Sequence, residues 1–169
     1  MPCRCREPFA PLALKDDLMH KIFITLALAA TAAVAAPAMA ADNCATTIEA
    51  NDMMQFNVKN VDVPKTCKNF AITLKHVGKM PNASLGHNVV VSTTADVTAV
   101  ATDGVKAGPA ADYVKANDAR VLAHTKVIGG GESTTVQLDV SKLKADGKYS
   151  YFCSFPGHFS VMQGTLALK

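Results

Sequence analysis

The chain is organised around one segment near its C-terminus, which reads Tyr151-Phe152-Cys153-Ser154-Phe155-Pro156-Gly157-His158-Phe159-Ser160-Val161-Met162. This segment places a thiol, an imidazole and a thioether within ten residues, with the spacing C-x4-H-x3-M. Thiolate and thioether are soft ligands and imidazole is intermediate, a combination that suits copper cycling between Cu(I) and Cu(II). Aromatic and apolar residues surround the three donors, so a metal bound there would be largely desolvated.

The first forty residues have the layout of a secretory signal peptide. Met19-His20-Lys21 gives a basic start, the largely apolar run 22–34 follows, and Ala38-Met39-Ala40 ends the segment. An A-x-A triplet is a cleavage signal, and the apolar run is too short to span a bilayer comfortably. We therefore expect residues 1–40 to be an N-terminal extension and signal peptide with its core at 19–40, cleaved after Ala40 on export to the periplasm.

The remaining residues, 41–169, are enough for one ordinary domain. They carry 13 basic and 11 acidic side chains, a net charge of +2, and Arg120 is their only arginine. A mild charge without runs of one sign argues against nucleic-acid binding. No later stretch is long and apolar enough to cross a membrane, so we expect no stable membrane association.

Three cysteines remain after cleavage, Cys44, Cys67 and Cys153. In an oxidising compartment Cys44 and Cys67 fit a disulfide, which leaves Cys153 as an odd thiol. A free thiol would be a liability in such a compartment unless a metal occupied it.

Short strand-like segments separated by turns predict an all-β fold. In residues 68–76 a large apolar side chain recurs at every second position, which places Phe70, Ile72 and Leu74 on one face of a strand. We expect further strands at 46–50, 55–58, 88–92, 121–127, 134–140, 148–154 and 165–168. Alanine-rich residues 95–105 and 112–117 predict one or two short helices that pack on the sheet. Seven or eight short strands with one helical insertion indicate a β-sandwich or Greek-key barrel.

A copper electron-transfer site uses two imidazoles and a thiolate, with a weak axial thioether. The C-terminal segment supplies only His158, so the second imidazole must come from His76, His87 or His124. His87 is favoured, because it follows a glycine at a turn that opens an apolar strand. The residues alone leave the other two open.

Residues 41–169 resemble the azurins, small bacterial blue copper proteins of the cupredoxin family. The matching motifs include Cys44 and Cys67, Gly86-His87-Asn88, Asp103-Gly104, Arg120-Val121, Ala123-His124-Thr125-Lys126, Asp139-Val140-Ser141-Lys142-Leu143-Lys144 and Phe152-Cys153-Ser154-Phe155-Pro156-Gly157-His158. The C-x4-H-x3-M spacing is specific, since plastocyanins shorten the first gap and pseudoazurins lengthen the second. The resemblance implies a cupredoxin Greek-key sandwich with a helical flap between two strands.

The resemblance also implies a ligand set. His87, Cys153 and His158 would be equatorial copper ligands, with Met162 as a long axial contact and the Gly86 carbonyl opposite it.

Asn88 would tie the two ligand loops together, and the backbone N–H groups of Asn88 and Phe155 would donate to the Cys153 sulfur. His76 would lie near the site but outside the ligand set, as a partly buried titratable histidine.

The function implied is a periplasmic, monomeric electron carrier rather than an enzyme. Cytochrome c and periplasmic reductases or dehydrogenases are the expected redox partners, docking on an apolar patch of Leu85, Pro156 and Phe159 around His158. The sequence departs from familiar azurins at Leu85, at Phe159 and at Val89, where a core tryptophan is common, and these departures bear on partner preference.

Three other functions are alternatives. A copper-binding or delivery protein without electron transfer would favour an exposed site, whereas Cys153 stands among aromatic residues. A copper enzyme would need further histidines for a second metal centre, and residues 41–169 contain four. Zinc in a Cys/His2 site is the third.

Overall fold

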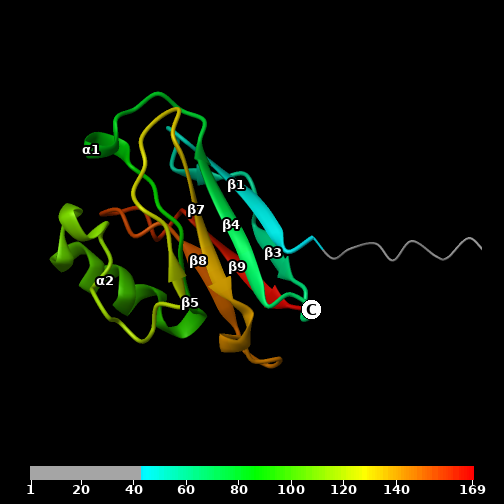
Figure 1. Cartoon of the computed structure of the whole chain (residues 1–169). Coiled ribbons are helices and arrows are strands. Elements are labelled where there is room, and N and C mark those ends of the chain that lie inside the picture. Colours follow the sequence, from blue (N-terminus) through cyan, green and yellow to red (C-terminus); the bar gives the residue numbers. More distant parts are fainter. Residues whose placement is uncertain (1–42) are drawn as a thin grey trace, which may run out of the picture. The chain divides into compact units, whose positions relative to one another are not determined.

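Two β-sheets pack face to face, with helices at one side (Figure 1). The computed structural model describes residues 43–169, and the expected signal peptide lies outside that part. The strands are β1 (Ala45–Asn51), β2 (Gln55–Phe56), β3 (Asn60–Val63), β4 (Asn69–His76), β5 (Val90–Thr93), β6 (Ala123–His124), β7 (Ser133–Asp139), β8 (Tyr149–Phe152) and β9 (Gln163–Leu168). The α-helices are α1 (Asn82–Leu85) and α2 (Val97–Ala107), and short 3-10 turns occupy Thr94–Asp96, Pro109–Ala111 and Val140–Lys142.

The strand order confirms the predicted Greek-key sandwich. One sheet has the order β2-β1-β4-β7 and the other β3-β9-β8-β5-β6, so the chain crosses repeatedly from sheet to sheet. The pairs β1/β4 and β3/β9 are parallel, and the other pairs are antiparallel. Parallel neighbours cannot be joined by a tight turn, which is why these strands come from distant parts of the sequence.

The main core lies between the sheets, and β4 shows how the sequence builds it. Phe70, Ile72, Leu74 and His76 alternate with more exposed residues, and all four point inward. Burying an apolar side chain of this size stabilises the fold by about 1.5–3 kcal/mol. His76 enters the interior because it continues the period of the strand, and a carboxylate oxygen of Asp52 lies 3.2 Å from its Nε2.

A second, smaller core lies between α2 and the outer face of the β5–β8 pair. Val90 and Phe152 face Val97, Val100 and Ala101 of the helix. Strands β5 and β8 are thus covered on both faces, which explains why their residues are buried almost without a break instead of alternating between buried and exposed.

Several predicted elements are wrong in detail. Residues 112–117 are not a helix, because Asp112, Tyr113 and Asn117 have φ values of 53°, 54° and 56°, which a right-handed helix excludes. The predicted strand 121–127 is reduced to β6, since the Val127 N–H donates to the Asp112 side chain instead of to a strand. Strand β3 and helix α1 were not predicted.

The disulfide between Cys44 and Cys67 is confirmed. It joins the residue directly before β1 to the loop that precedes β4, and the Cys44 carbonyl also accepts a hydrogen bond from the Ala71 N–H. Cys153 is a buried free thiol. None of the helices in residues 43–169 is long and apolar enough to cross a membrane.

Removing the disulfide should destabilise the sandwich without changing its fold. The double variant Cys44→Ala/Cys67→Ala frees a loop whose ends are 23 residues apart in the sequence. On the chain-entropy model this lowers the free energy of unfolding by about 3 kcal/mol. Urea unfolding of the metal-free protein measures the change. A mild reductant should lower the free energy of unfolding of the wild-type protein toward that of the variant. If the two proteins have the same free energy of unfolding without reductant, the disulfide does not stabilise the fold.

Candidate metal centre

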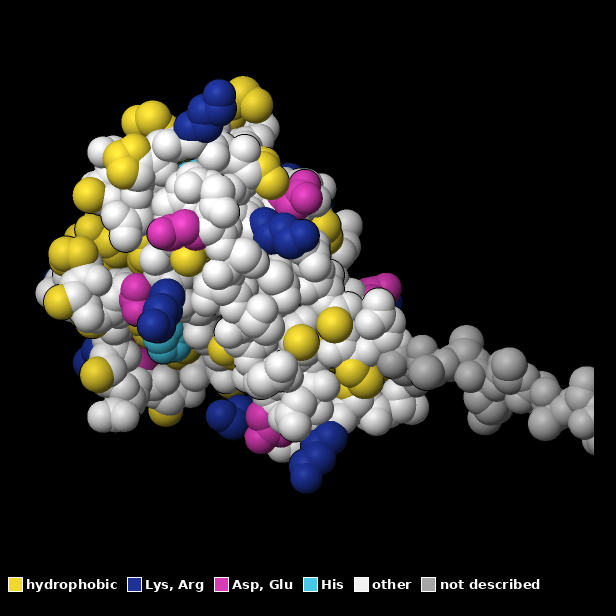
Figure 2. All heavy atoms as spheres, turned by 45° about the horizontal axis from the view of Figure 1, so that its top comes forward, with side chains coloured by type: hydrophobic (Ala, Val, Ile, Leu, Met, Phe, Trp, Pro, Cys, Tyr) yellow, Lys and Arg dark blue, Asp and Glu magenta, His cyan; other side chains and the backbone are white. Residues whose placement is uncertain are grey.

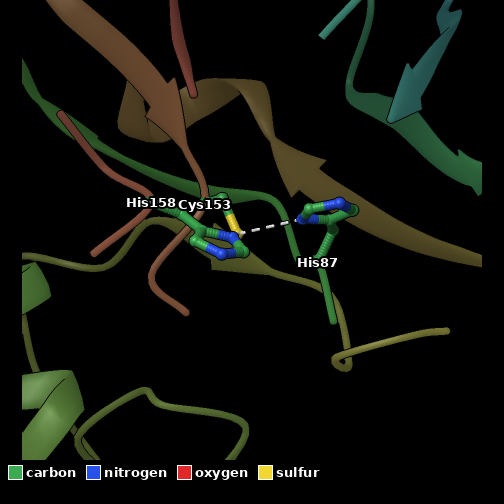
Figure 3. Close-up of side chains that lie close together, drawn as sticks. All are labelled: His87, Cys153 and His158. Atoms are coloured by element: carbon green, nitrogen blue, oxygen red, sulfur yellow. Dashed lines mark hydrogen bonds between the residues drawn. The ribbon is translucent and has the colours of Figure 1, made fainter. Parts of the chain in front are cut away.

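Three buried donor side chains meet at one end of the sandwich (Figure 3). Cys153 directly follows β8, His87 lies between α1 and β5, and His158 lies in the turn beyond Cys153. The Cys153 Sγ is 3.9 Å from Nδ1 of His87 and 3.6 Å from Nδ1 of His158. Figure 3 shows the sulfur between the two imidazole rings. One potential ligand atom from each of the three residues lies within 4.8 Å of those of the other two.

The tautomer of His87 follows from its surroundings. Its Nε2 lies 3.0 Å from the backbone carbonyl of Asn51, which can only accept, so Nε2 carries the proton. The lone pair of Nδ1 then faces the Cys153 sulfur. Burial lowers the pKa of His87 to about 4 and also lowers the pKa of His158. Both imidazoles are therefore neutral at pH 7, the form that binds a metal.

The backbone before His87 is fixed by close packing. The His87 N–H donates to the Ile128 carbonyl, and the Ile128 N–H donates back to His87. A Cβ at Gly86 would lie 2.5 Å from the Asn82 carbonyl oxygen and 2.5 Å from Cγ1 of Val127. Only glycine fits there, which explains the Gly-His pair in physical terms.

Cys153 lies in an apolar environment that opposes ionisation. It is completely buried, and burial raises the pKa of its thiol to about 12. The backbone N–H groups of Asn88 and Phe155 face the sulfur and lower the pKa of the thiol, which offsets part of the effect of burial. Since a bound cation is what stabilises a thiolate in such a place, the donor set of one thiol and two neutral imidazoles fits a copper ion.

The C-terminal loop is closed on itself by backbone hydrogen bonds. The Cys153 N–H donates to the Met162 carbonyl at 3.0 Å, and the Met162 N–H donates to the His158 carbonyl at 2.8 Å. Gly157, with a φ of 82°, allows the tight turn before His158. Met162 is fully buried in the same apolar cluster as Cys153. The loop thus brings the thiol and the thioether to one end of the core.

Asn88 connects the two ligand segments. Its Oδ1 accepts from the Ser154 N–H, and its Nδ2 donates to the Ser154 hydroxyl and to the Asp112 carbonyl, each at 2.8 Å. Asn88 is itself fully buried, so these bonds satisfy an amide that would otherwise destabilise the core.

The structure separates the other two histidines from the three-donor cluster. His76 is fully buried rather than partly buried, and its ring centroid lies 4.5 Å from that of His87. Its Nε2 is 3.2 Å from Oδ1 of Asp52, an oxygen that also accepts from the Met80 N–H, while the Lys79 N–H donates to Oδ2 of the same carboxylate. His124 is exposed on β6.

Sequence reasoning missed Asn51, Asp112 and Ser154 as partners of the site. Asn51, the last residue of β1, acts through its carbonyl. Asp112 acts through its carbonyl and its side chain, from a segment that was predicted to be helical. A backbone carbonyl carries no residue-specific signal, so no sequence pattern could identify the first. The left-handed turn of Asp112 is equally hard to read, because asparagine or glycine usually marks it.

The expected docking patch is only partly at the surface. Pro156 is exposed, Leu85 is half-buried, and Phe159 packs against the cluster of Val90 and Phe152. Other apolar side chains exposed near the ligand segments are Met53, Met54, Met80 and Val161. Figure 2 shows hydrophobic side chains gathered along the upper and left edges of the face turned to the viewer.

Comparison with known proteins agrees with this geometry. The model of the copper-binding plastocyanin/azurin family matches residues 42–169. Azurin from Alcaligenes faecalis is 62% identical over 125 residues, covering 74% of this chain and 98% of the relative. Azurin from Achromobacter denitrificans is 58% identical over 145 residues, covering 86% and 96%.

A solved azurin structure, from the obligate methylotroph Methylomonas sp. strain J, is 45% identical with a TM-score of 0.73. The match covers 75% of this chain and 98% of that one. The neutral imidazoles, the buried thiol and the sandwich around them are thus found in a chain that belongs to the plastocyanin/azurin family of copper-binding proteins.

Proposed function

We propose that this protein is a periplasmic carrier of single electrons that acts as a monomer. The ligands would be His87, Cys153 and His158, with Met162 as a long axial contact and the Gly86 carbonyl as a weak one. The observation that carries the proposal is the buried thiol held between the Nδ1 atoms of two neutral imidazoles. Copper in such a set supplies reversible one-electron chemistry.

The rigidity of the site supports electron transfer rather than copper delivery. His87 is fixed through both its backbone and its Nε2, and the Cys153–Met162 loop is closed by its own hydrogen bonds. Ligands that cannot move hold similar positions in both redox states, which keeps reorganisation small. A delivery protein needs an exchangeable site, whereas Cys153 has no exposed surface.

The colour of the copper-loaded protein tests the ligand set. Adding Cu(II) to the metal-free protein should give an intense blue band, from thiolate-to-copper charge transfer, that bleaches with a mild reductant. Cys153→Ser should abolish the band, because a hydroxyl is a poor ligand for copper. Met162→Leu should keep the band and shift the reduction potential.

Visible absorption and voltammetry measure these outcomes. A pale or colourless wild-type product would refute the proposed ligands. Loss of all copper binding in Met162→Leu would contradict the axial role of the thioether.

We propose that electrons are exchanged with cytochrome c and with periplasmic reductases or dehydrogenases at an apolar rim, which consists of the patch of Leu85, Pro156 and Phe159 together with the exposed Val161. Small apolar patches suit brief encounters, since redox complexes bury little area. Val161 is 55% exposed and directly precedes Met162, and Leu85 directly precedes Gly86.

A lysine in the rim should slow exchange with a partner without changing the copper spectrum. Leu85→Lys and Val161→Lys should each lower the second-order rate constant with a small cytochrome c about tenfold, equivalent to about 1.4 kcal/mol. Stopped-flow absorbance measures it. Gln137→Lys, on the exposed face of β7, is the matched control. Equal slowing by the control would show a general charge effect and contradict docking at the rim.

The periplasmic address depends on residues 1–40, which lie outside the part described by the structure. We propose that they form an N-terminal extension and signal peptide and that residues 41–169 are the exported domain. The protein recovered from a periplasmic extract should begin at Ala41 when its N-terminus is sequenced. A start at Pro2 would contradict the cleavage site.

A further inference from the structure

The turn after α2 reaches the metal centre, although it contributes none of the expected ligands. We propose that Asp112 and Tyr113 are positioning residues that hold the loops of His87 and His158 in register before copper binds. This inference rests on the proposed ligand set. The contacts of the two residues carry it.

Asp112 contacts the His87 segment on both sides. Its backbone carbonyl accepts from Nδ2 of Asn88, the residue that follows His87, at 2.8 Å. Its Oδ1 accepts from the Val127 N–H, also at 2.8 Å. Val127 directly precedes Ile128, which exchanges two backbone hydrogen bonds with His87. One residue therefore fixes both strands of the bridge that carries the ligand.

Tyr113 contacts the other ligand loop. Its ring centroid lies 5.1 Å from that of Phe155, in an edge-to-face arrangement with an interplanar angle of 69°. The Phe155 ring in turn lies 4.7 Å from the imidazole of His158. Aromatic pairs at these separations attract each other beyond their buried area. Two consecutive residues thus support the two histidine loops.

The backbone of these two residues is unusual. Asp112 and Tyr113 have φ values of 53° and 54°, in the left-handed region that residues with a side chain rarely adopt. Aspartate tolerates this region better than tyrosine. Two such residues in succession persist only where the surrounding structure holds them. We infer that this left-handed backbone is what allows Asp112 and Tyr113 to contact the two ligand loops.

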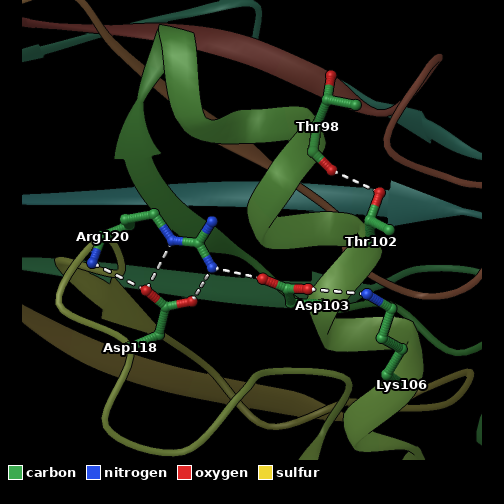
Figure 4. Close-up of polar contacts among 6 residues, drawn as sticks. All are labelled: Thr98, Thr102, Asp103, Lys106, Asp118 and Arg120. Atoms are coloured by element: carbon green, nitrogen blue, oxygen red, sulfur yellow. Dashed lines mark hydrogen bonds and ion pairs between the residues drawn. The ribbon is translucent and has the colours of Figure 1, made fainter.

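Helix α2 supplies a firm base for the turn. A Cβ at Gly104 would lie 2.0 Å from the Tyr113 carbonyl oxygen, so the turn packs directly on a bare stretch of helix. Figure 4 shows the second attachment, in which Arg120 binds both Asp103 of the helix and Asp118. The segment that follows α2 therefore packs on the helix on one side and contacts the segments of His87 and His158 on the other.

The test compares Asp112→Ala with Asp112→Asn. Alanine removes the Oδ1 acceptor and disfavours the left-handed backbone, whereas asparagine keeps an acceptor at the same place and tolerates that backbone. In the metal-free protein, amide hydrogen exchange at Val127 should be about tenfold faster in Asp112→Ala, as expected when a hydrogen bond is lost. Asp112→Asn should restore slow exchange.

Copper-loaded protein provides the second readout. Asp112→Ala should release copper to a chelator several-fold faster and shift the reduction potential, because His87 is held less firmly. Asp118→Ala is the matched control, since it loosens the same segment at Arg120 without contacting a ligand loop. It should leave the potential unchanged.

Equal effects of Asp112→Ala and Asp118→Ala on the potential would reduce Asp112 to a general stabiliser and overturn the proposal. Unchanged exchange at Val127 would overturn it as well. If Asp112→Ala does not fold, Tyr113→Leu tests the contact of the turn with the His158 loop. This variant should shift the NMR resonances of the His158 ring, and unchanged resonances would contradict the role of Tyr113. A wrong ligand set shows itself separately, as a colourless copper complex with normal exchange at Val127.

Discussion

The arrangement of the candidate metal centre depends on one buried amide. Asn88 and Ser154 are 66 residues apart in the sequence, and the side chain of Asn88 joins them by hydrogen bonds in both directions. One belongs to the segment of His87 and the other directly follows Cys153. Because the amide is fully buried, its hydrogen bonds have no competition from water, and the register of the two segments is set within the core. The positions of the donors follow from that register.

The sandwich was largely readable from the sequence, and the reason is periodicity. Strand β4 alternates cleanly between buried and more exposed residues, whereas β5 and β8 are buried almost without a break because the other sheet and helix α2 cover them on opposite faces. The segment 109–127 was not readable. Its shape is set by side-chain contacts such as that of Asp112 with the Val127 N–H, which override the local preference for helix or strand.

The candidate site, too, was predictable from the sequence in part. The spacing of Cys153, His158 and Met162 was plain in the sequence. The glycine before His87 only favoured that histidine over His76 and His124, and the resemblance to azurins implied the choice. The structure brings His87, Cys153 and His158 together and leaves His124 at the surface. The alternation of β4 accounts for the burial of His76, but the contact of its ring with His87 and the role of the Asn51 carbonyl as a hydrogen-bond acceptor depend on how distant segments pack together. No local pattern carries that information.

The protonation of the free site has a consequence for the thermodynamics of metal loading. At neutral pH the two imidazoles have already lost their extra protons, since burial holds the pKa of both below the usual value. The thiol of Cys153, with its pKa raised to about 12, still carries one. Metal uptake must therefore expel one proton per ion, and apparent affinity rises about tenfold for each unit of pH. Burial thus leaves the donor set uncharged without metal, and it couples metal binding to acidity with a stoichiometry of one proton per ion.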